Sequence, residues 1–167
     1  MLYTHLAELY SKLEQTTKRL EKNEILSEFL KKLSPKEKDT IYLLKGKIFA
    51  DYDSRETGIS EQLAIKALAK SSGAKEEDIV KKWKSLGDLG QVAEETITKK
   101  KQSTIFSHKI STEKVLENLR KLPELQGKGT VAKKLALVSE LITSSSPLEA
   151  KYLMRTLLGD LRIGLGD

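Results

Sequence analysis

The chain opens with MLYTHLAELYSKLEQTTKRLEKNEILSEFL (residues 1–30), in which apolar side chains return every three or four positions. These side chains are Leu2, Leu6, Leu9, Leu13, Leu20, Ile25, Leu26, Phe29 and Leu30. The spacing is that of one face of an α-helix, and the rest of the chain shows no sustained alternation of apolar and polar residues. The sequence therefore predicts an all-α protein.

Local sequence marks where the helices begin and end. SPKE (residues 34–37) and SPLE (146–149) each place serine at an N-cap, proline at the first helical position and glutamate at the third. The glycines expected at C-caps or tight turns are Gly46, Gly73, Gly87, Gly90, Gly127, Gly129, Gly159 and Gly164. The expected helices span about residues 2–14, 17–33, 35–46, 60–71, 75–85, 88–97, 111–121, 130–144 and 147–158.

The two helix starts belong to a longer internal repeat. KRL (18–20) precedes the first and KKL (133–135) the second, and each half runs on to a leucine-rich end with glycine, LLKG (43–46) or LLGD (157–160). No period of about 34 or 40 residues recurs three times, which argues against a helical solenoid. We expect one compact multi-helix domain over residues 1–167, with approximate halves 1–98 and 99–167 related by a pseudo-two-fold axis.

Composition restricts the class of protein. With 167 residues, 38% of them hydrophobic, the chain can bury one core, and no apolar run approaches the roughly 20 residues that cross a bilayer. There is no cysteine, and the first residues lack a secretory apolar stretch. We expect a soluble, cytoplasmic protein with no membrane partner.

Positive charge is concentrated in one part of the chain. Residues 1–98 hold 17 basic and 17 acidic side chains, whereas residues 99–167 hold 13 basic and 7 acidic, so the second part carries the whole net charge of +6. Such concentration is typical of a surface that meets a polyanion, most often nucleic acid. A solvated lysine-rich surface explains the same numbers, and composition alone leaves both interpretations open.

No catalytic constellation is visible in the sequence. The two histidines, His5 and His108, stand in no metal-ligand spacing and beside no nucleophile motif. GKG at residues 127–129 lacks the preceding strand of a phosphate-binding loop. We therefore expect no catalytic residue, metal ligand or cofactor in this chain.

A binding constellation remains at two helix starts, where a hydroxyl residue precedes two basic residues. Its members are Thr17, Lys18 and Arg19 at the first start, and Thr130, Lys133 and Lys134 at the second. Free N–H groups and the positive end of the helix dipole, together with basic side chains, suit a phosphate. Ordinary N-capping followed by exposed lysines is the alternative, and recurrence at both copies favours binding.

The closing segment YLMRTLLGDLRIGLGD (152–167) sets Arg162 between Gly159 and Gly164. Glycines let a backbone approach a ligand closely, and arginine reaches into a narrow, negatively charged minor groove. A helix C-cap followed by an exposed linker charge is the alternative interpretation.

This segment resembles the end of the DNA-binding domain of archaeal and eukaryotic ATP-dependent DNA ligases. The resemblance extends over nearly the whole chain, with the archaeal branch nearest. It includes KRLEK (18–22), KALAKSSG (66–73), GDLG (87–90) followed by VAE (92–94), and TVAKK (130–134).

The resemblance implies an all-α domain that grips the minor groove of nicked duplex DNA, while adenylation and OB-fold domains complete a ring around the duplex. It assigns DNA binding to the two helix starts and the closing segment. The residues are Thr17, Lys18, Arg19, Gly127, Lys128, Gly129, Thr130, Lys133, Lys134, Arg162 and Gly164.

The ligase reaction needs a lysine in a Lys-x-Asp-Gly motif to carry AMP, and residues 1–167 hold no such motif. The resemblance implies a chain cut before the adenylation domain and unable to seal nicks alone. It also implies that the full-length protein is an ATP-dependent DNA ligase of replication, repair and recombination, which uses ATP and a divalent metal such as Mg²⁺. We expect a monomer.

QSTIF (102–106) follows three lysines and resembles a short sliding-clamp-binding box. The resemblance implies that Gln102 hydrogen-bonds to the clamp while Ile105 and Phe106 enter an apolar pocket. Packing of Ile105 and Phe106 on the domain's own core is the alternative. A different class of function also stays open: a helical protein-interaction module whose basic surface meets the clamp or another acidic partner, with no direct DNA role.

Overall fold

The computed structural model describes residues 1–101 and 109–165 of the chain. The helices are α1 (Tyr3–Glu14), α2 (Arg19–Lys31), α3 (Thr40–Leu44), α4 (Glu61–Ser72), α5 (Glu76–Leu86), α6 (Leu89–Lys101), α7 (Thr112–Lys121), α8 (Thr130–Thr143) and α9 (Pro147–Leu157), with 3-10 turns η1 (Pro35–Glu37) and η2 (Leu122–Glu124). Within the described ranges no strand forms, and one isolated β-bridge pairs Leu2 with Ser111. The all-α prediction is confirmed.

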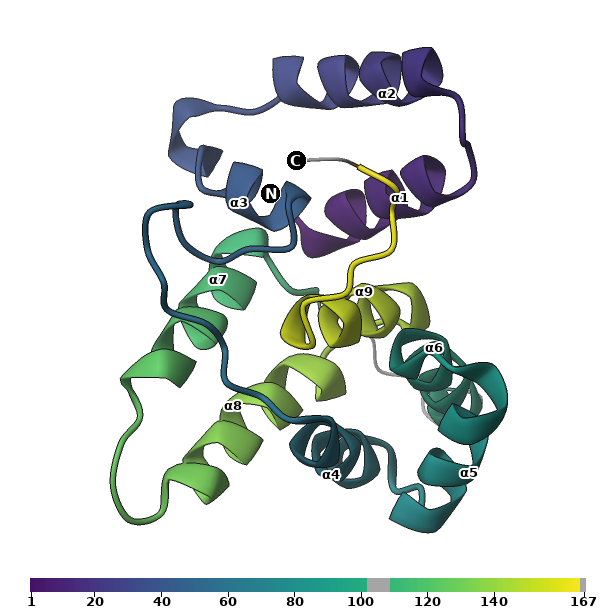
Figure 1. The fold of residues 1–167 in the computed structure, drawn as a ribbon, viewed down its shortest axis with the longest axis vertical. Coiled ribbons are helices and arrows are strands. Elements are labelled where there is room, and N and C mark those ends of the chain that lie inside the picture. Colours follow the sequence, from purple (N-terminus) through teal and green to yellow (C-terminus); the bar gives the residue numbers. More distant parts are fainter. Residues whose placement is uncertain (102–108, 166–167) are drawn as a thin grey trace.

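Helix α9 lies at the centre of the molecule, among α1, α6, α7 and α8 (Figure 1). Its start is fixed by the predicted capping box, in which Ser146 accepts from the amide of Glu149 and the Glu149 carboxylate accepts from the amide of Ser146. Both faces of this helix are buried, so it contributes Tyr152 and Leu153 as well as Met154 to the core. A helix buried all round is typical of the centre of a bundle.

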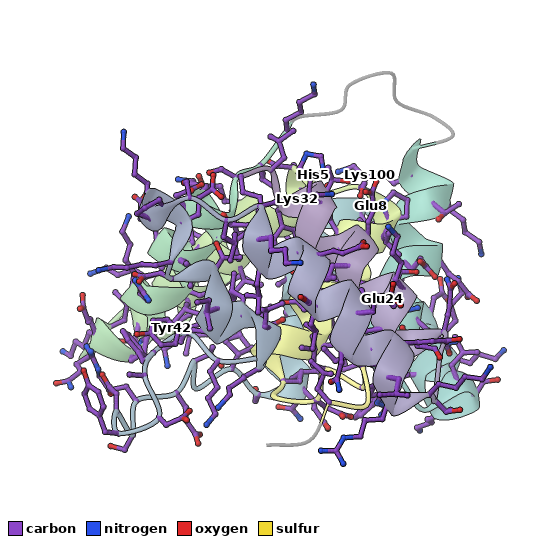
Figure 2. All side chains as sticks on the ribbon, turned by 90° about the horizontal axis from the view of Figure 1, so that it is seen from above. His5, Glu8, Glu24, Lys32, Tyr42 and Lys100 are labelled. Carbon is purple, nitrogen blue, oxygen red and sulfur yellow. The ribbon has the colours of Figure 1, made fainter. Side chains whose placement is uncertain are left out.

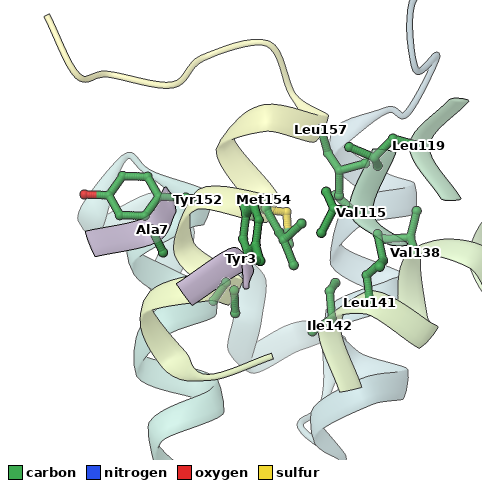
Figure 3. Close-up of a cluster of buried hydrophobic side chains, with 14 of the residues drawn as sticks. Tyr3, Ala7, Val115, Leu119, Val138, Leu141, Ile142, Tyr152, Met154 and Leu157 are labelled. Atoms are coloured by element: carbon green, nitrogen blue, oxygen red, sulfur yellow. The ribbon is translucent and has the colours of Figure 1, made fainter. Parts of the chain in front are cut away.

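The surrounding helices each present one apolar face to α9. Helix α1 buries residues at the spacing seen in the opening sequence, and α7 and α8 add branched side chains (Figure 3). The Tyr10 and Tyr152 rings lie 5.0 Å apart at 46°, and the Tyr10 hydroxyl donates to the carbonyl of Leu43. Burial of each large apolar side chain stabilises the fold by about 1.5–3 kcal/mol, so this core holds the helices in place.

Helix α2 lies on the outside of α1 and has no fully buried residue. It contacts the core only through half-buried Ile25, Leu26 and Phe29. A hollow of about 420 Å³ between the two helices is lined in part by the side chains of His5 and Lys32 (Figure 2). Because its packing is one-sided, α2 presents most of its length, including its beginning, to solvent.

The sequence-based helix bounds are confirmed to within a few residues except for the helix expected at 35–46, which was wrong. The chain there forms η1 and then α3, with a break between them. Arg120 holds Asp39 at 2.9 Å at this break, and Leu43 and Leu44 turn into the core. Tertiary contacts therefore override local helix propensity. The pseudo-two-fold relation of the halves 1–98 and 99–167 stays a prediction.

Candidate nucleic-acid interface

The first predicted group of contacts, the α2 site, comprises Thr17, Lys18 and Arg19. Lys18 is the N-cap residue of α2 in extended conformation, and Arg19 is the first helical residue. All three side chains are exposed. Lys18 makes a loose ion pair with Glu21 (3.7 Å), and its amide donates to Thr16 Oγ1 (3.2 Å). The hydroxyl that accepts a hydrogen bond in this turn is therefore that of Thr16, whereas the side chain of Thr17 is exposed to solvent.

The second group, the α8 site, comprises Gly127, Lys128, Gly129, Thr130, Lys133 and Lys134. Gly129 is the N-cap of α8 with φ +77°, and Gly127 has φ +87°, a region that costs residues with a side chain roughly 1–2 kcal/mol. The hydroxyl of Thr130 donates to the carbonyl of Gly127 and closes the turn. Lys128 and Lys133 are exposed beside it.

Neither helix start has a side chain that accepts a hydrogen bond from its first-turn amides. By contrast α4, α7 and α9 each begin with a serine that does so, namely Ser60, Ser111 and Ser146. The uncapped amides of α2 and α8 stand beside basic side chains, an arrangement that binds phosphate. Helix α5 also starts without a side-chain cap, but its first turn carries three acidic residues and no lysine or arginine.

The C-terminal segment, residues 160–165, crosses to α2. Lys22 Nζ donates to the carbonyls of Ile163 (3.0 Å) and Gly164 (2.9 Å), which places this segment beside the α2 site. Arg162 adopts a left-handed conformation with φ +56°. Its guanidinium donates to Asp160 (2.7 Å) and to the carbonyl of Gly87 (3.1 Å), and 43% of the side chain is exposed. A groove contact by Arg162 therefore competes with hydrogen bonds inside the domain.

A segment that the sequence did not single out, residues 45–60, connects the two groups and is called the connecting loop. Gly46 lies against Leu161, Thr57 Oγ1 donates to the carbonyl of Leu157 (2.9 Å), and Gly58 lies against the ammonium of Lys134. Together with the end of α9, the loop lines a hollow of about 590 Å³. Among the glycines that the sequence predicted at turns, Gly46 lies in this loop. Gly58, which also has a positive φ (+64°), was not among them.

The connecting loop runs from α3 past α7 and α8 to α4 (Figure 1). The α2 site and the beginning of α8 lie toward opposite ends of the molecule, and they do not meet directly. Contacts link them in sequence, from Lys22 to the C-terminal segment, from that segment to Gly46, and from Gly58 to Lys134. These contacts join the two sites through the C-terminal segment and the connecting loop, and we call the exposed residues of these four parts the connected surface.

Most charged side chains on the connecting loop are paired with each other. Asp51 accepts hydrogen bonds from Lys47 (2.7 Å) and Lys45 (3.2 Å), which lower the pKa of that carboxyl. Arg55 binds Asp53 (2.7 Å) and so lowers its pKa. An incoming phosphate would therefore meet lysines and an arginine that already hold a carboxylate, and the free basic groups of the surface lie mainly in the α2 and α8 sites.

Beneath this surface lies a buried ion network around Arg155. Its guanidinium is 2.6 Å from Asp88 and 3.0 Å from Glu14, and it also donates to the carbonyl of Leu161 (3.3 Å). Burial raises the pKa of Asp88, but the hydrogen bonds and charge of Arg155 outweigh burial and bring that pKa below its ordinary value. The network ties α1, α6 and α9 to the C-terminal segment.

The clamp-binding prediction at Gln102, Ile105 and Phe106 lies outside the described residues, as does His108. Within residues 1–101 and 109–165, no group of three or more histidine or acidic side chains is placed to hold a metal ion. In the same ranges, no helix combines the length and apolarity needed to cross a bilayer.

Fold and surface together define an all-helical domain with exposed basic side chains at the uncapped starts of α2 and α8. Comparison with known proteins gives the family. The model of the family described as DNA ligase N terminus matches residues 2–167, and the chain belongs to this family.

Curated relatives agree with the family match. The chain is 43% identical to the DNA ligase of Methanosphaera stadtmanae over 99% of its length, and 38% identical to that of Nitrosopumilus maritimus over 100%. It is 36% identical to the DNA ligase of Thermococcus onnurineus, again over 100% of the chain. The chain covers only 29–30% of the length of these relatives. The resemblance to archaeal ligases is confirmed.

Proposed function

We propose that this domain binds nicked duplex DNA and positions it for strand joining by ATP-dependent catalytic domains of a longer protein. The observation that carries the proposal is the connected surface on which the α2 site, the C-terminal segment and the α8 site lie. Family membership over residues 2–167 supports a role in DNA ligation. ATP and a divalent metal such as Mg²⁺ belong to the proposed full-length enzyme.

Recognition on this surface would act mainly through phosphates and groove shape. Uncapped amides and lysines at the starts of α2 and α8 suit backbone phosphates, which carry no base identity. Arg162 and Gly164, beside the α2 site, suit the narrow minor groove. We therefore expect little preference for base sequence and a steep loss of affinity with salt.

The test is a titration of the 167-residue chain with nicked and intact duplexes at several salt concentrations. The variant Lys133→Glu/Lys134→Glu should weaken duplex binding by about tenfold or more, because two phosphate contacts are replaced by repulsion. The matched control is Lys66→Glu/Lys70→Glu, two exposed lysines of α4 outside both sites. Absence of duplex binding at low salt would overturn the proposal and favour a protein-interaction module.

The sliding clamp is a second proposed partner, supported by the sequence QSTIF at 102–106 and not by any contact in the structure. Replacement of Ile105 and Phe106 by alanine should abolish clamp binding and leave duplex affinity unchanged. Loss of the fold in this variant would instead indicate that the two side chains pack on the domain's own core. Sedimentation of the chain alone tests the proposed monomer.

A further inference from the structure

A second basic cluster lies away from the connected surface, where the end of α4 meets α5 and α6. There a hollow of about 500 Å³ opens. Its lining residues are Ser72, Gly73, Ala74, Asp78, Ile79, Lys81, Lys82, Thr96, Lys99 and Lys100. None of them belongs to the α2 site, the α8 site or the connecting loop. We call this feature the lysine hollow.

The charge of the lysine hollow is strongly unbalanced. Among its described lining residues four are lysines and one, Asp78, is an acid. Lys82 comes from α5 and Lys99 from α6, so the packing of two helices brings two ammonium groups together. Glu95, which is not among the lining residues, adds a second carboxylate at 3.9 Å from Lys82 Nζ.

The two ammonium groups are close enough to disfavour each other's charge. Contact with Lys99 is the largest cause that lowers the pKa of Lys82, followed by burial, and the charges of Glu95 and Asp78 oppose this shift without reversing it. Like charges held together in this way are relieved by an anion placed between them. The unbalanced charge is thus a property of the folded helices and not of a flexible tail.

The remainder of the hollow is formed by packed residues of α4, α5 and α6. Ile79 is buried and half-buried Ala74 lies beside it, which gives the hollow an apolar side. Lys100, labelled in Figure 2, donates to the carbonyl of Ser71 at the end of α4 and so anchors α6 to α4. Lys81 and Lys99 stay exposed at the edge.

We propose that the lysine hollow is an oxyanion site that takes a phosphoryl group, bound between Lys82 and Lys99. Lysine suits this ligand because its ammonium is a compact charge with three donors that need no planar partner. A tetrahedral phosphoryl oxyanion can accept from both ammonium groups at once. The site stands whether or not the connected surface binds DNA, because the two share no residue.

Pyrophosphate is the probe, titrated at low salt into the 167-residue chain and followed by amide NMR spectra. We expect saturable shifts confined to residues 72–74, 78–82 and 96–100. The variant Lys82→Gln/Lys99→Gln should lower pyrophosphate affinity about a hundredfold, since each lost hydrogen bond to a charged group is worth about one decade. Lys82→Arg/Lys99→Arg keeps the charge and should retain binding.

Lys66→Gln/Lys70→Gln removes the same charge from α4 outside the hollow and serves as the matched control. Shifts that do not saturate, or an equal loss of affinity in this control, would overturn the site, as would unchanged affinity in the Lys82→Gln/Lys99→Gln variant. If that variant unfolds, Lys99→Gln, at an exposed position, should by itself lower pyrophosphate affinity about tenfold. A parallel titration with duplex DNA identifies the source of the phosphoryl group. If Lys82→Gln/Lys99→Gln loses duplex affinity and the α4 control does not, the phosphoryl group belongs to the DNA backbone. If neither variant loses duplex affinity, the ligand is a free oxyanion.

Discussion

Gly90 is buried where α6 crosses α9, and a Cβ atom there would lie 2.7 Å from Arg155 Cγ and 2.9 Å from the carbonyl oxygen of Lys151. Alanine normally stabilises a helix by about 1 kcal/mol relative to glycine. Here Gly90→Ala should instead destabilise the domain by about 1–3 kcal/mol, because backbone cannot yield as a side chain can. Urea denaturation measures this, with exposed Gln91→Ala as the control in the same helix. An unchanged free energy of unfolding would contradict the close approach of the two helices.

Asp88 contributes to the dependence of stability on pH. The pKa of Asp88 in the folded protein is below its ordinary value, so its stabilising contribution is present above about pH 4 and is lost as pH falls through the folded pKa. Glu14, whose pKa is also lowered against the effect of burial, adds to the same acid loss. Asp88→Asn should cost about 3–5 kcal/mol at neutral pH, because Arg155 stays buried with one partner fewer.

The measurement for Asp88 is the free energy of unfolding of parent and variant across the acid range. The difference between them should shrink as pH falls below about 4, where the parent's carboxylate also becomes protonated. A difference that stays constant with pH would show that the substitution destabilises the protein only through packing. It would contradict a stabilising charge interaction between Asp88 and Arg155.

At the scale of elements, the two SPxE signals have unequal consequences. Ser146 caps α9, an 11-residue helix at the centre of the core, whereas Ser34 begins only the short turn η1. Ser146→Ala should therefore destabilise the domain by about 1 kcal/mol. Ser34→Ala, the matched control, should cost clearly less because its turn is exposed. Thermal unfolding of both variants compares them, and equal shifts in Tm would contradict this ranking.

The sequence predicted the helices well because each buries one face and the period of that face is visible locally. It failed at residues 35–46, where Asp39 is held by Arg120 from 81 positions away. Gly90 was expected at a turn but lies inside α6. A glycine is needed there because α9 approaches closely, and not because the chain changes direction. Local pattern reports propensity, and contacts between distant residues decide where a helix breaks.

At the scale of the whole molecule, the sequence named groups of contact residues but not the surface that joins them. Lys22 and Ile163, 141 positions apart, and Thr57 and Leu157, 100 apart, carry no shared signal in the chain. The connecting loop has neither a helical period nor an excess of free positive charge. Only the folded arrangement of α3, α4 and α9 gives it a role, so residues 45–60 were missed.

If one duplex spans that surface, the salt dependence of duplex binding must reflect phosphate contacts at both the α2 site and the α8 site. Each lost phosphate contact lowers the slope of log affinity against log salt by about 0.9, so Lys18→Gln/Arg19→Gln and Lys128→Gln/Lys133→Gln should each lower it by up to about 1.8. The combined variant should show the sum, because the two sites lie too far apart to share a phosphate. Lys66→Gln/Lys70→Gln should leave the slope unchanged. A combined loss no larger than that of one pair would mean that a single end of the surface binds DNA.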